Sequence, residues 1–156
     1  MSYLIDIKLD DAALPEPTPE VAQERRVAIF DLLEENSFAL SNEGAPTGPF
    51  KLLLGLEERK LAFHVSDKDD APIQSFLLSV SPLSQVIKDY FEIVESYFKA
   101  VTSLPPAQIE AIDMGRRGIH NEGAEQLRER LSGKIDIDQL TAKRLFTLIC
   151  ALHFKG

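Results

Sequence analysis

The chain has 156 residues, 44% of them hydrophobic and 27% charged, with a formal net charge of −8. This length and composition are typical of one globular domain that buries about two-thirds of its unfolded surface. Its acidic balance repels phosphate backbones and argues against a nucleic-acid-binding protein. The single cysteine, Cys150, excludes an internal disulfide and suits a reducing compartment. We find no signal peptide and no apolar run long enough for a membrane span, so we expect a cytoplasmic protein without a membrane partner.

The chain begins with a predicted strand and a predicted helix. Residues 3–9 alternate apolar and polar side chains from Ile5 onward, which predicts a half-buried strand. Thr18 followed by Pro19 is typical of a helix N-cap with proline in the first turn. We expect an amphipathic helix from there to about Glu35.

Three further strands are predicted in the middle of the chain. They follow a loop rich in Gly, Pro, Asn and Ser at residues 41–49. Short turns join them, which favours an antiparallel meander. One of these turns, residues 67–70, loosely resembles a calcium loop but lacks its central glycine and its glutamate, so we expect a solvated turn. The predicted strands are residues 50–56, 60–66 and 73–80.

The C-terminal half predicts three helices. Apolar residues recur at three–four spacing over residues 83–101, until Leu104-Pro105-Pro106 ends this helix and begins the next. Ser132-Gly133 is typical of a C-cap with a left-handed glycine, and Asp138 of the N-cap of a final helix. We therefore expect one α+β domain over residues 1–156, of order β-α-β-β-β-α-α-α. Its antiparallel meander of about four strands would carry the helices on one face.

The second of these three helices has charged residues inside its apolar stripe. At about 100° per residue, Asp113, Arg116 and His120 fall in the same sector as Leu127 and Leu131. Buried charge is costly unless it is paired, so these groups need partners. The spacing of Asp113 from Arg116 allows an ion pair along the helix.

Three glycines in the same helix, Gly115, Gly118 and Gly123, each cost about 1 kcal/mol relative to alanine. One explanation is close backbone approach to another helix, a partner subunit or a ligand. The other is a break near Gly118, which would expose free N–H groups beside the neighbouring basic side chains and form an anion site. The sequence leaves both open.

The polar residues of this stretch also admit two interpretations. In one, they form a pocket in which arginines bind a carboxylate or phosphate, His120 transfers a proton, and Asp113 or Glu122 sets its tautomer. In the other, they form a buried salt-bridge network that joins this helix to the sheet or to a partner. The candidate catalytic residues are His120, Glu122 and Asp113. The candidate anion-binding or interface residues are Arg116, Arg117, Asn121, Lys143 and Arg144.

We expect no metal and no cofactor. Residues 120–122 have the His-x-Glu spacing of zinc deaminases, but the Pro-Cys-x-x-Cys element is missing. A zinc site built from His120, Glu122 and either His64 or His153 is the remaining alternative. His64, His153 and Cys150 each have a simpler role. We expect His64 on the exposed side of a strand, His153 at a helix C-terminus and Cys150 in the core.

Three segments carry a resemblance to a known family. They are IEAIDMGRRGIHNEG at residues 109–123, VIKDYF at residues 86–91 and KRLFTLICALH at residues 143–153. Together they resemble uncharacterised protein family 0262, a bacterial and mainly alphaproteobacterial family, over nearly the whole chain. The resemblance implies a stand-alone cytoplasmic protein and brings no activity, cofactor or catalytic residue.

Two functions of different kinds follow. The first is a non-catalytic protein-interaction or regulatory domain that binds a protein partner or itself and has an Arg/His-lined polar site. The second is an enzyme or binder acting on a small phosphorylated or carboxylate anion through Arg116, Arg117 and His120. The second requires these side chains to converge on a cleft open to solvent. The first allows them to be sealed inside or to lie on a flat patch.

Overall fold

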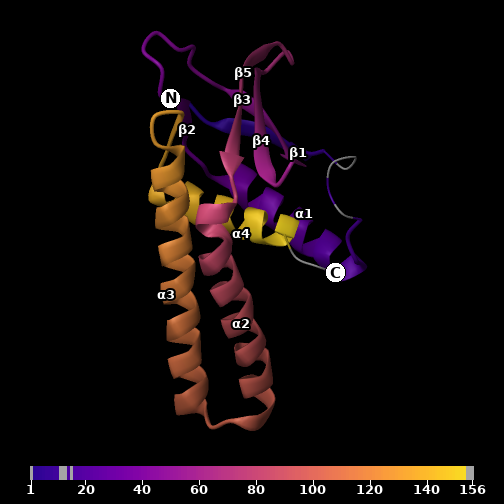
Figure 1. The fold of residues 1–156 in the computed structure, drawn as a ribbon, viewed down its shortest axis with the longest axis vertical. Helices are drawn as coiled ribbons and strands as arrows, with labels where there is room; N and C mark the ends of the chain where they lie inside the picture. The colour runs from indigo at the N-terminus through magenta and orange to yellow at the C-terminus, as the bar shows by residue number, and fades with distance from the viewer. Residues whose placement is uncertain (1, 11–13, 15, 154–156) are drawn as a thin grey trace.

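The structure, a computed structural model, describes residues 2–10, 14 and 16–153, except for the side chain of residue 153. The described chain forms four helices and six strands, arranged as in Figure 1. In chain order they are β1 (Leu4–Leu9), α1 (Pro19–Glu34), β2 (Phe38–Leu40), β3 (Phe50–Glu57), β4 (Lys60–Asp67), β5 (Pro72–Ser79), α2 (Ser81–Ser103), α3 (Pro106–Leu131), β6 (Ile135–Ile137) and α4 (Gln139–His153).

Three predicted helix boundaries are confirmed, two by a side-chain capping contact and one by backbone conformation. The Thr18 hydroxyl oxygen accepts a hydrogen bond from the Val21 N–H at 3.3 Å, at the start of α1. The Asp138 carboxylate accepts one from the Thr141 N–H at 2.8 Å, at the start of α4. Gly133, at φ +89°, follows α3 in the left-handed conformation that glycine adopts without strain. These ends depend on neighbouring residues alone, which is why the sequence predicts them.

The main sheet has the strand order β1-β3-β4-β5. As predicted, β3, β4 and β5 form antiparallel pairs. The expectation that β1 joins a purely antiparallel meander is wrong, because β1 pairs parallel with β3, with Ile7 opposite Leu52. The intervening α1 carries the chain across the domain, so that β3 runs in the same direction as β1. Strands β2 and β6 form a separate antiparallel pair, with Phe38 opposite Ile137. At three residues each they are too short for alternation to reveal.

One face of the main sheet packs into the core and the other faces outward. Along β3, Leu52 and Leu54 are buried while Leu53 is exposed. Along β4, Phe63 is buried while the His64 side chain is 43% exposed. This alternation is that of a sheet with one face in the core and the other toward solvent. The buried side chains form one hydrophobic cluster that includes residues of all four helices.

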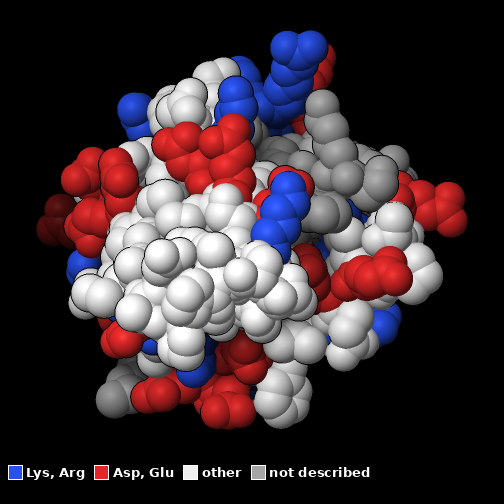
Figure 2. All heavy atoms as spheres, turned by 90° about the horizontal axis from the view of Figure 1, so that it is seen from below, with Lys and Arg blue, Asp and Glu red and all other residues white. Residues whose placement is uncertain are grey.

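Helices α2 and α3 form an antiparallel hairpin that extends away from the sheet, α1 and α4 (Figure 1). Helix α3 is continuous from Pro106 to Leu131, so the alternative of a break near Gly118 is wrong. Seen end-on, the hairpin presents a region without charged side chains, with both acidic and basic side chains around it in projection (Figure 2). Within the described residues, none of the helices combines the length and the apolar character that crossing a membrane requires. Exposed apolar side chains of the hairpin are Phe98, Val101, Leu104 and Met114.

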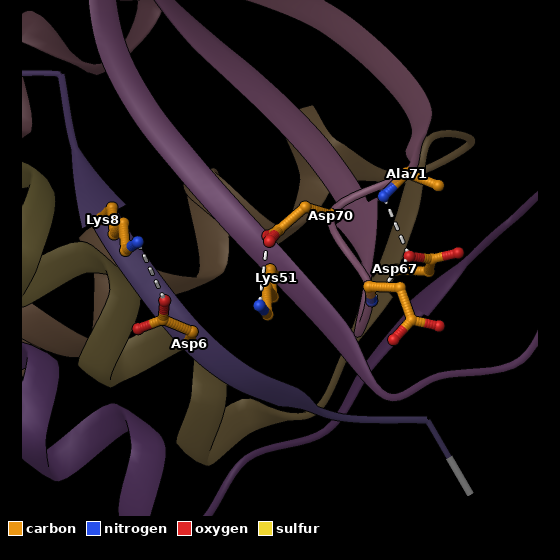
Figure 3. Close-up of polar contacts among 7 residues, drawn as sticks. Asp6, Lys8, Lys51, Asp67, Asp70 and Ala71 are labelled. Carbon is orange, nitrogen blue, oxygen red and sulfur yellow. Dashed lines mark hydrogen bonds and ion pairs between the residues drawn. The ribbon is translucent and has the colours of Figure 1, made fainter.

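The turn between β4 and β5 is held by its own aspartates (Figure 3). One oxygen of Asp67 accepts hydrogen bonds from the N–H groups of Asp69 at 2.8 Å and Ala71 at 3.0 Å. Asp70 reaches the ammonium of Lys51 on β3 at 3.1 Å. Asp67 therefore closes this turn through hydrogen bonds to its own backbone, as an aspartate commonly does in a turn.

Candidate functional site

A solvent-reachable hollow of about 400 Å³ lies where α2, α3 and α4 meet. Five of the seven side chains that line it are among the predicted site residues. They come from two helices, so the packing of α4 against α3 assembles the site. The lining residues are Tyr90, Arg116, Arg117, His120, Asn121, Lys143 and Thr147.

Asp113 holds both arginines of α3. One of its oxygens accepts hydrogen bonds from Arg116 Nε at 3.0 Å and Nη2 at 2.7 Å. The other accepts one from Arg117 Nη2 at 2.5 Å. The hydrogen bond from Arg116, joined by that from Arg117, holds the pKa of Asp113 below its usual range. The pairing predicted from sequence spacing is confirmed, and one carboxylate faces two guanidinium groups.

The two arginines differ in exposure. The side chain of Arg116 is 32% exposed and its guanidinium lies 5.8 Å from the ring centroid of Tyr97. That of Arg117 is 68% exposed. Arg116 favours the charged form of Tyr90, but burial outweighs this effect and raises the pKa of Tyr90. Arg116 is therefore held on several sides, whereas Arg117 is restrained by Asp113 and otherwise reaches solvent.

His120 bonds Thr147 of α4, with 2.8 Å between Nε2 and Oγ1. The Thr147 hydroxyl donates its proton to the Lys143 carbonyl oxygen at 3.1 Å. When the hydroxyl proton is on this carbonyl oxygen, Thr147 Oγ1 accepts from His120, and the tautomer that fits has its proton on Nε2 and a lone pair on Nδ1. Burial, together with the positive charges of Arg116 and Lys143, lowers the pKa of His120. The imidazole is therefore neutral near pH 7.

The expectation that Asp113 or Glu122 sets the tautomer of His120 is wrong. Asp113 is engaged by the two arginines, and Glu122 accepts a hydrogen bond from Gln126 at 3.3 Å, one turn further along α3. Thr147 holds the imidazole instead. Carboxylates are common orienting groups for histidine, but the hydroxyl on α4 is the group that packing brings within reach.

Arg144 lies apart from the hollow that its neighbour Lys143 lines. Its guanidinium donates to the carbonyl oxygens of Asp31 at 2.6 Å and Glu35 at 3.1 Å, where α1 ends. Carbonyl groups in the last turn of a helix have no partner within the helix, and a cation there also favours the helix dipole. The structure thus gives Arg144 a capping role and removes it from the candidate anion site.

The sequence does not indicate that Tyr90 and Thr147 are site residues, because Tyr90 has the pattern of a core helix position and Thr147 that of a surface helix position. Tyr90 falls in the apolar stripe of α2, and its centroid lies 5.2 Å from that of His120. A tyrosine in such a stripe needs a partner for its hydroxyl, which is the one available signal. Thr147 is four residues after Lys143 and so shares its face of α4. Neither pattern indicates that Tyr90 and Thr147 face α3.

The alternative of a zinc site receives no support from the described residues, among which no three His, Cys, Asp or Glu side chains could hold a metal ion. His64 lies on the main sheet and bonds the Ser75 hydroxyl at 2.9 Å. The side chain of His153 lies outside the described residues. Cys150 is buried, and burial raises the pKa of its thiol, as expected of a core residue.

Comparison with known proteins agrees with the predicted resemblance. The model of the Uncharacterised protein family (UPF0262) matches residues 1–155. The chain is 60% identical to a UPF0262 protein of Dinoroseobacter shibae over 157 residues, covering 99% of each chain. It is 58% identical to one of Jannaschia sp. over 154 residues, covering 99% of each, and 57% identical to one of Ruegeria pomeroyi over 159 residues, covering 100% of this chain and 99% of the relative. No solved structure matches the chain. On this evidence the chain belongs to the UPF0262 family.

Proposed function

We propose that this chain is a regulatory binding protein that holds a small phosphorylated or carboxylate anion in the hollow between α2, α3 and α4. The supporting observation is that three cationic side chains, Arg116, Arg117 and Lys143, line one solvent-reachable hollow in a protein of net charge −8. Asp113 balances only part of this charge. An anion entering the hollow therefore meets a local excess of positive charge.

The donors left over after Asp113 is satisfied are suited to an anion. A guanidinium has five N–H donors, and Asp113 takes only one from Arg117 and two from Arg116. Arg117 can thus present a second edge to a phosphate or carboxylate, with Lys143 as a point charge. Asn121 adds an amide donor at the same wall. The two helices would clamp the anion between them.

Catalysis by His120 on the same anion is the alternative form of this proposal. The unprotonated Nδ1 is a suitable proton acceptor, since it lies on a neutral imidazole held through its other nitrogen. Binding and catalysis are distinguished by incubating a ligand found in the screen below with the protein and following its concentration. Consumption that is lost in His120→Gln would establish an enzyme, whereas unchanged ligand would leave a binding protein.

The proposal is tested by thermal shift and calorimetry with sulfate, inorganic phosphate, phosphorylated metabolites and carboxylates. A ligand at 100 times its Kd stabilises by about 2.7 kcal/mol, which corresponds to a rise in Tm of about 5–10 °C for a chain of this size. Arg117→Ala combined with Lys143→Ala should abolish the shift. Arg144→Ala, which removes the neighbouring cation, should retain it. Equal responses of these two variants, or no response of the wild type to any anion, would contradict the proposal.

A second candidate function, protein interaction, is favoured by the end of the α2–α3 hairpin. Phe98 on α2 is 67% exposed and Met114 on α3 is 64% exposed. Seen end-on, the hairpin presents a region without charged side chains (Figure 2). Exposed apolar patches with a polar rim are typical of interaction sites. Near the end of the hairpin, Glu92, Glu95 and Glu110 are exposed, against one exposed lysine, Lys99, which lies 3.1 Å from Glu95. We therefore propose a partner surface that is apolar at its centre and basic at its rim.

This second function is tested by affinity capture of partner proteins with the wild type, Phe98→Glu and Arg117→Ala at increasing salt concentration. A partner with a basic surface that binds the wild type and Arg117→Ala, is lost with Phe98→Glu and weakens with salt would support it. Light scattering tests the alternative that a second copy of this chain occupies the surface. A dimer that Phe98→Glu dissociates would mean that the hairpin pairs with a second copy instead.

A further inference from the structure

A second hollow of about 320 Å³ adjoins the cationic one. It lies between α1, α2 and α4, and Tyr90 and Thr147 line both hollows. Its walls are largely apolar, in contrast to the hollow on the other side of these two residues. The residues that make it apolar are Val27, Ala28, Phe91, Val94, Cys150 and Ala151.

We propose that the ligand of this protein is an amphipathic anion, with one carboxylate or phosphate head at Arg117 and Lys143 and an apolar acyl or aryl body in the second hollow. This inference rests on the function proposed above and names its ligand class. The head needs the cations of one hollow, and the body removes apolar walls of the other from water. Thr147, which stands between them, is exposed at its surface, so one molecule can lie across it.

The acidic residues of the second hollow restrict the ligand to a single charged end. Glu24 and Asp31 of α1 line it together with Gln23, whereas no Lys or Arg is among its lining residues. A second phosphate or carboxylate in this hollow would face these carboxylates without a cation to offset them. The arrangement therefore disfavours dicarboxylates and dinucleotides and favours a ligand with one anionic end.

The size of the two hollows suits a small amphiphile. Small-molecule sites range from about 300 to 1,000 Å³ and are mostly apolar with a few convergent polar groups. The apolar hollow alone, at about 320 Å³, reaches the lower end of this range. Because apolar burial scales with the area removed from water, each methylene that enters it should tighten binding about two- to fourfold.

The test is calorimetric titration of the full chain with acetate, butanoate, hexanoate and octanoate, all below micelle-forming concentrations, and with inorganic phosphate and octanamide. The wild type should bind octanoate more tightly than acetate by two- to fourfold per methylene within the hollow. Octanamide, which has the same chain without the charge, should bind at least tenfold more weakly than octanoate. Arg117→Ala with Lys143→Ala should remove that difference.

Matched variants on α1 separate the apolar hollow from general charge effects. Val27 lines the hollow and is 47% exposed, so Val27→Glu places a carboxylate there without disturbing the core. Phe30, on the same helix, is 67% exposed and is not a lining residue. Val27→Glu should flatten the chain-length dependence, and Phe30→Glu should preserve it. Val94→Thr, which keeps the side-chain shape, should weaken octanoate binding and leave inorganic phosphate binding unchanged.

The outcomes distinguish the two proposals. If inorganic phosphate and acetate bind as tightly as octanoate, the anion site stands and the amphipathic ligand is wrong. If octanamide equals octanoate, the cationic head site plays no part and the inference is overturned. If no anion of any chain length binds, the proposed function fails as well. Equal chain-length dependence in Val27→Glu and Phe30→Glu would also overturn it, because the chain would then lie elsewhere.

Discussion

Gly123 of α3 lies directly against the ring of Phe146 of α4, so that a β-carbon added at Gly123 would overlap the ring atoms, with Cε1 and Cε2 at 2.6 Å. Phe146 is fully buried, and its centroid also lies 5.3 Å from that of His120. This contact sets how closely α4 approaches α3, and hence the distance between His120 and Thr147. The absence of a side chain at Gly123 is therefore a condition for the hollow.

Gly123→Ala should destabilise the protein by about 1–3 kcal/mol, because a buried ring has no space into which to move. Gly118→Ala is the matched control, since nothing lies within 4 Å of a β-carbon there. It should stabilise the protein by about 1 kcal/mol through helix propensity. Urea denaturation of both variants measures these changes. Equal effects of the two substitutions would mean that α3 does not contact α4 through Gly123.

Arg116→Ala should cost more stability than Arg117→Ala. Arg116 makes two hydrogen bonds to Asp113 and lies over the Tyr97 ring, whereas Arg117 makes one and is mostly exposed. We expect about 1–2 kcal/mol for Arg116→Ala and less than about 0.5 kcal/mol for Arg117→Ala. Anion affinity should show the opposite order, because Arg117 has more free donors. Chemical denaturation and calorimetry on the same two variants test both statements.

The free energy of unfolding should fall as the pH drops below about 6.5. Burial and the charges of Arg116 and Lys143 lower the pKa of His120 in the folded protein below its ordinary value of 6.5. Between these two pKa values the unfolded chain binds the proton and the folded chain does not, so stability decreases with decreasing pH. The stability contributed by neutral His120 is present above pH 6.5 and is lost as the pH falls toward its folded pKa.

His120→Gln should remove this part of the pH dependence, and His64→Gln on the sheet should retain it. Urea denaturation at pH 8.0, 6.5 and 5.5 gives the slopes. If His120→Gln keeps the wild-type slope, other groups govern the pH dependence of stability, and the pKa of buried His120 does not contribute to it.

Sulfate should bind more tightly at low pH. An anion in the hollow favours the protonated imidazole, so the pKa of His120 rises on binding and a proton is taken up. Because sulfate itself does not titrate near neutrality, a change in its affinity reports on the protein. We expect a three- to tenfold gain, as an order of magnitude, between pH 7.5 and 5.5 at low salt. A pH-independent Kd would place the anion away from His120.

Arg144→Ala should lower stability by about 1 kcal/mol while leaving anion affinity unchanged. The variant leaves the carbonyl oxygens of Asp31 and Glu35 without their charged donor. Arg144→Lys should recover part of the loss, since a lysine can approach one carbonyl. Thermal melts with and without sulfate test this. A loss of anion affinity would return Arg144 to the site.

The sequence by itself determined what depends on neighbours within a few residues. Thr18 and Asp138 begin their helices through contacts three residues away, and Gly133 follows the end of α3 through its own backbone conformation. The pairing of Asp113 with Arg116 and Arg117 follows from one turn of helix. The apolar periodicity likewise predicted strands β1, β3, β4 and β5 and helix α2, but not how the helices pair.

Only the tertiary structure decided which helix faces meet. The parallel pairing of β1 with β3, the hydrogen bond between His120 and Thr147, and the capping of α1 by Arg144 each join residues far apart in the chain. Local spacing carries no information about such pairs, because they depend on how the helices pack around one core. The close contact of Gly123 with Phe146 brings Lys143 and Thr147 of α4 to the hollow, whereas Arg144, one residue on from Lys143, is turned toward α1.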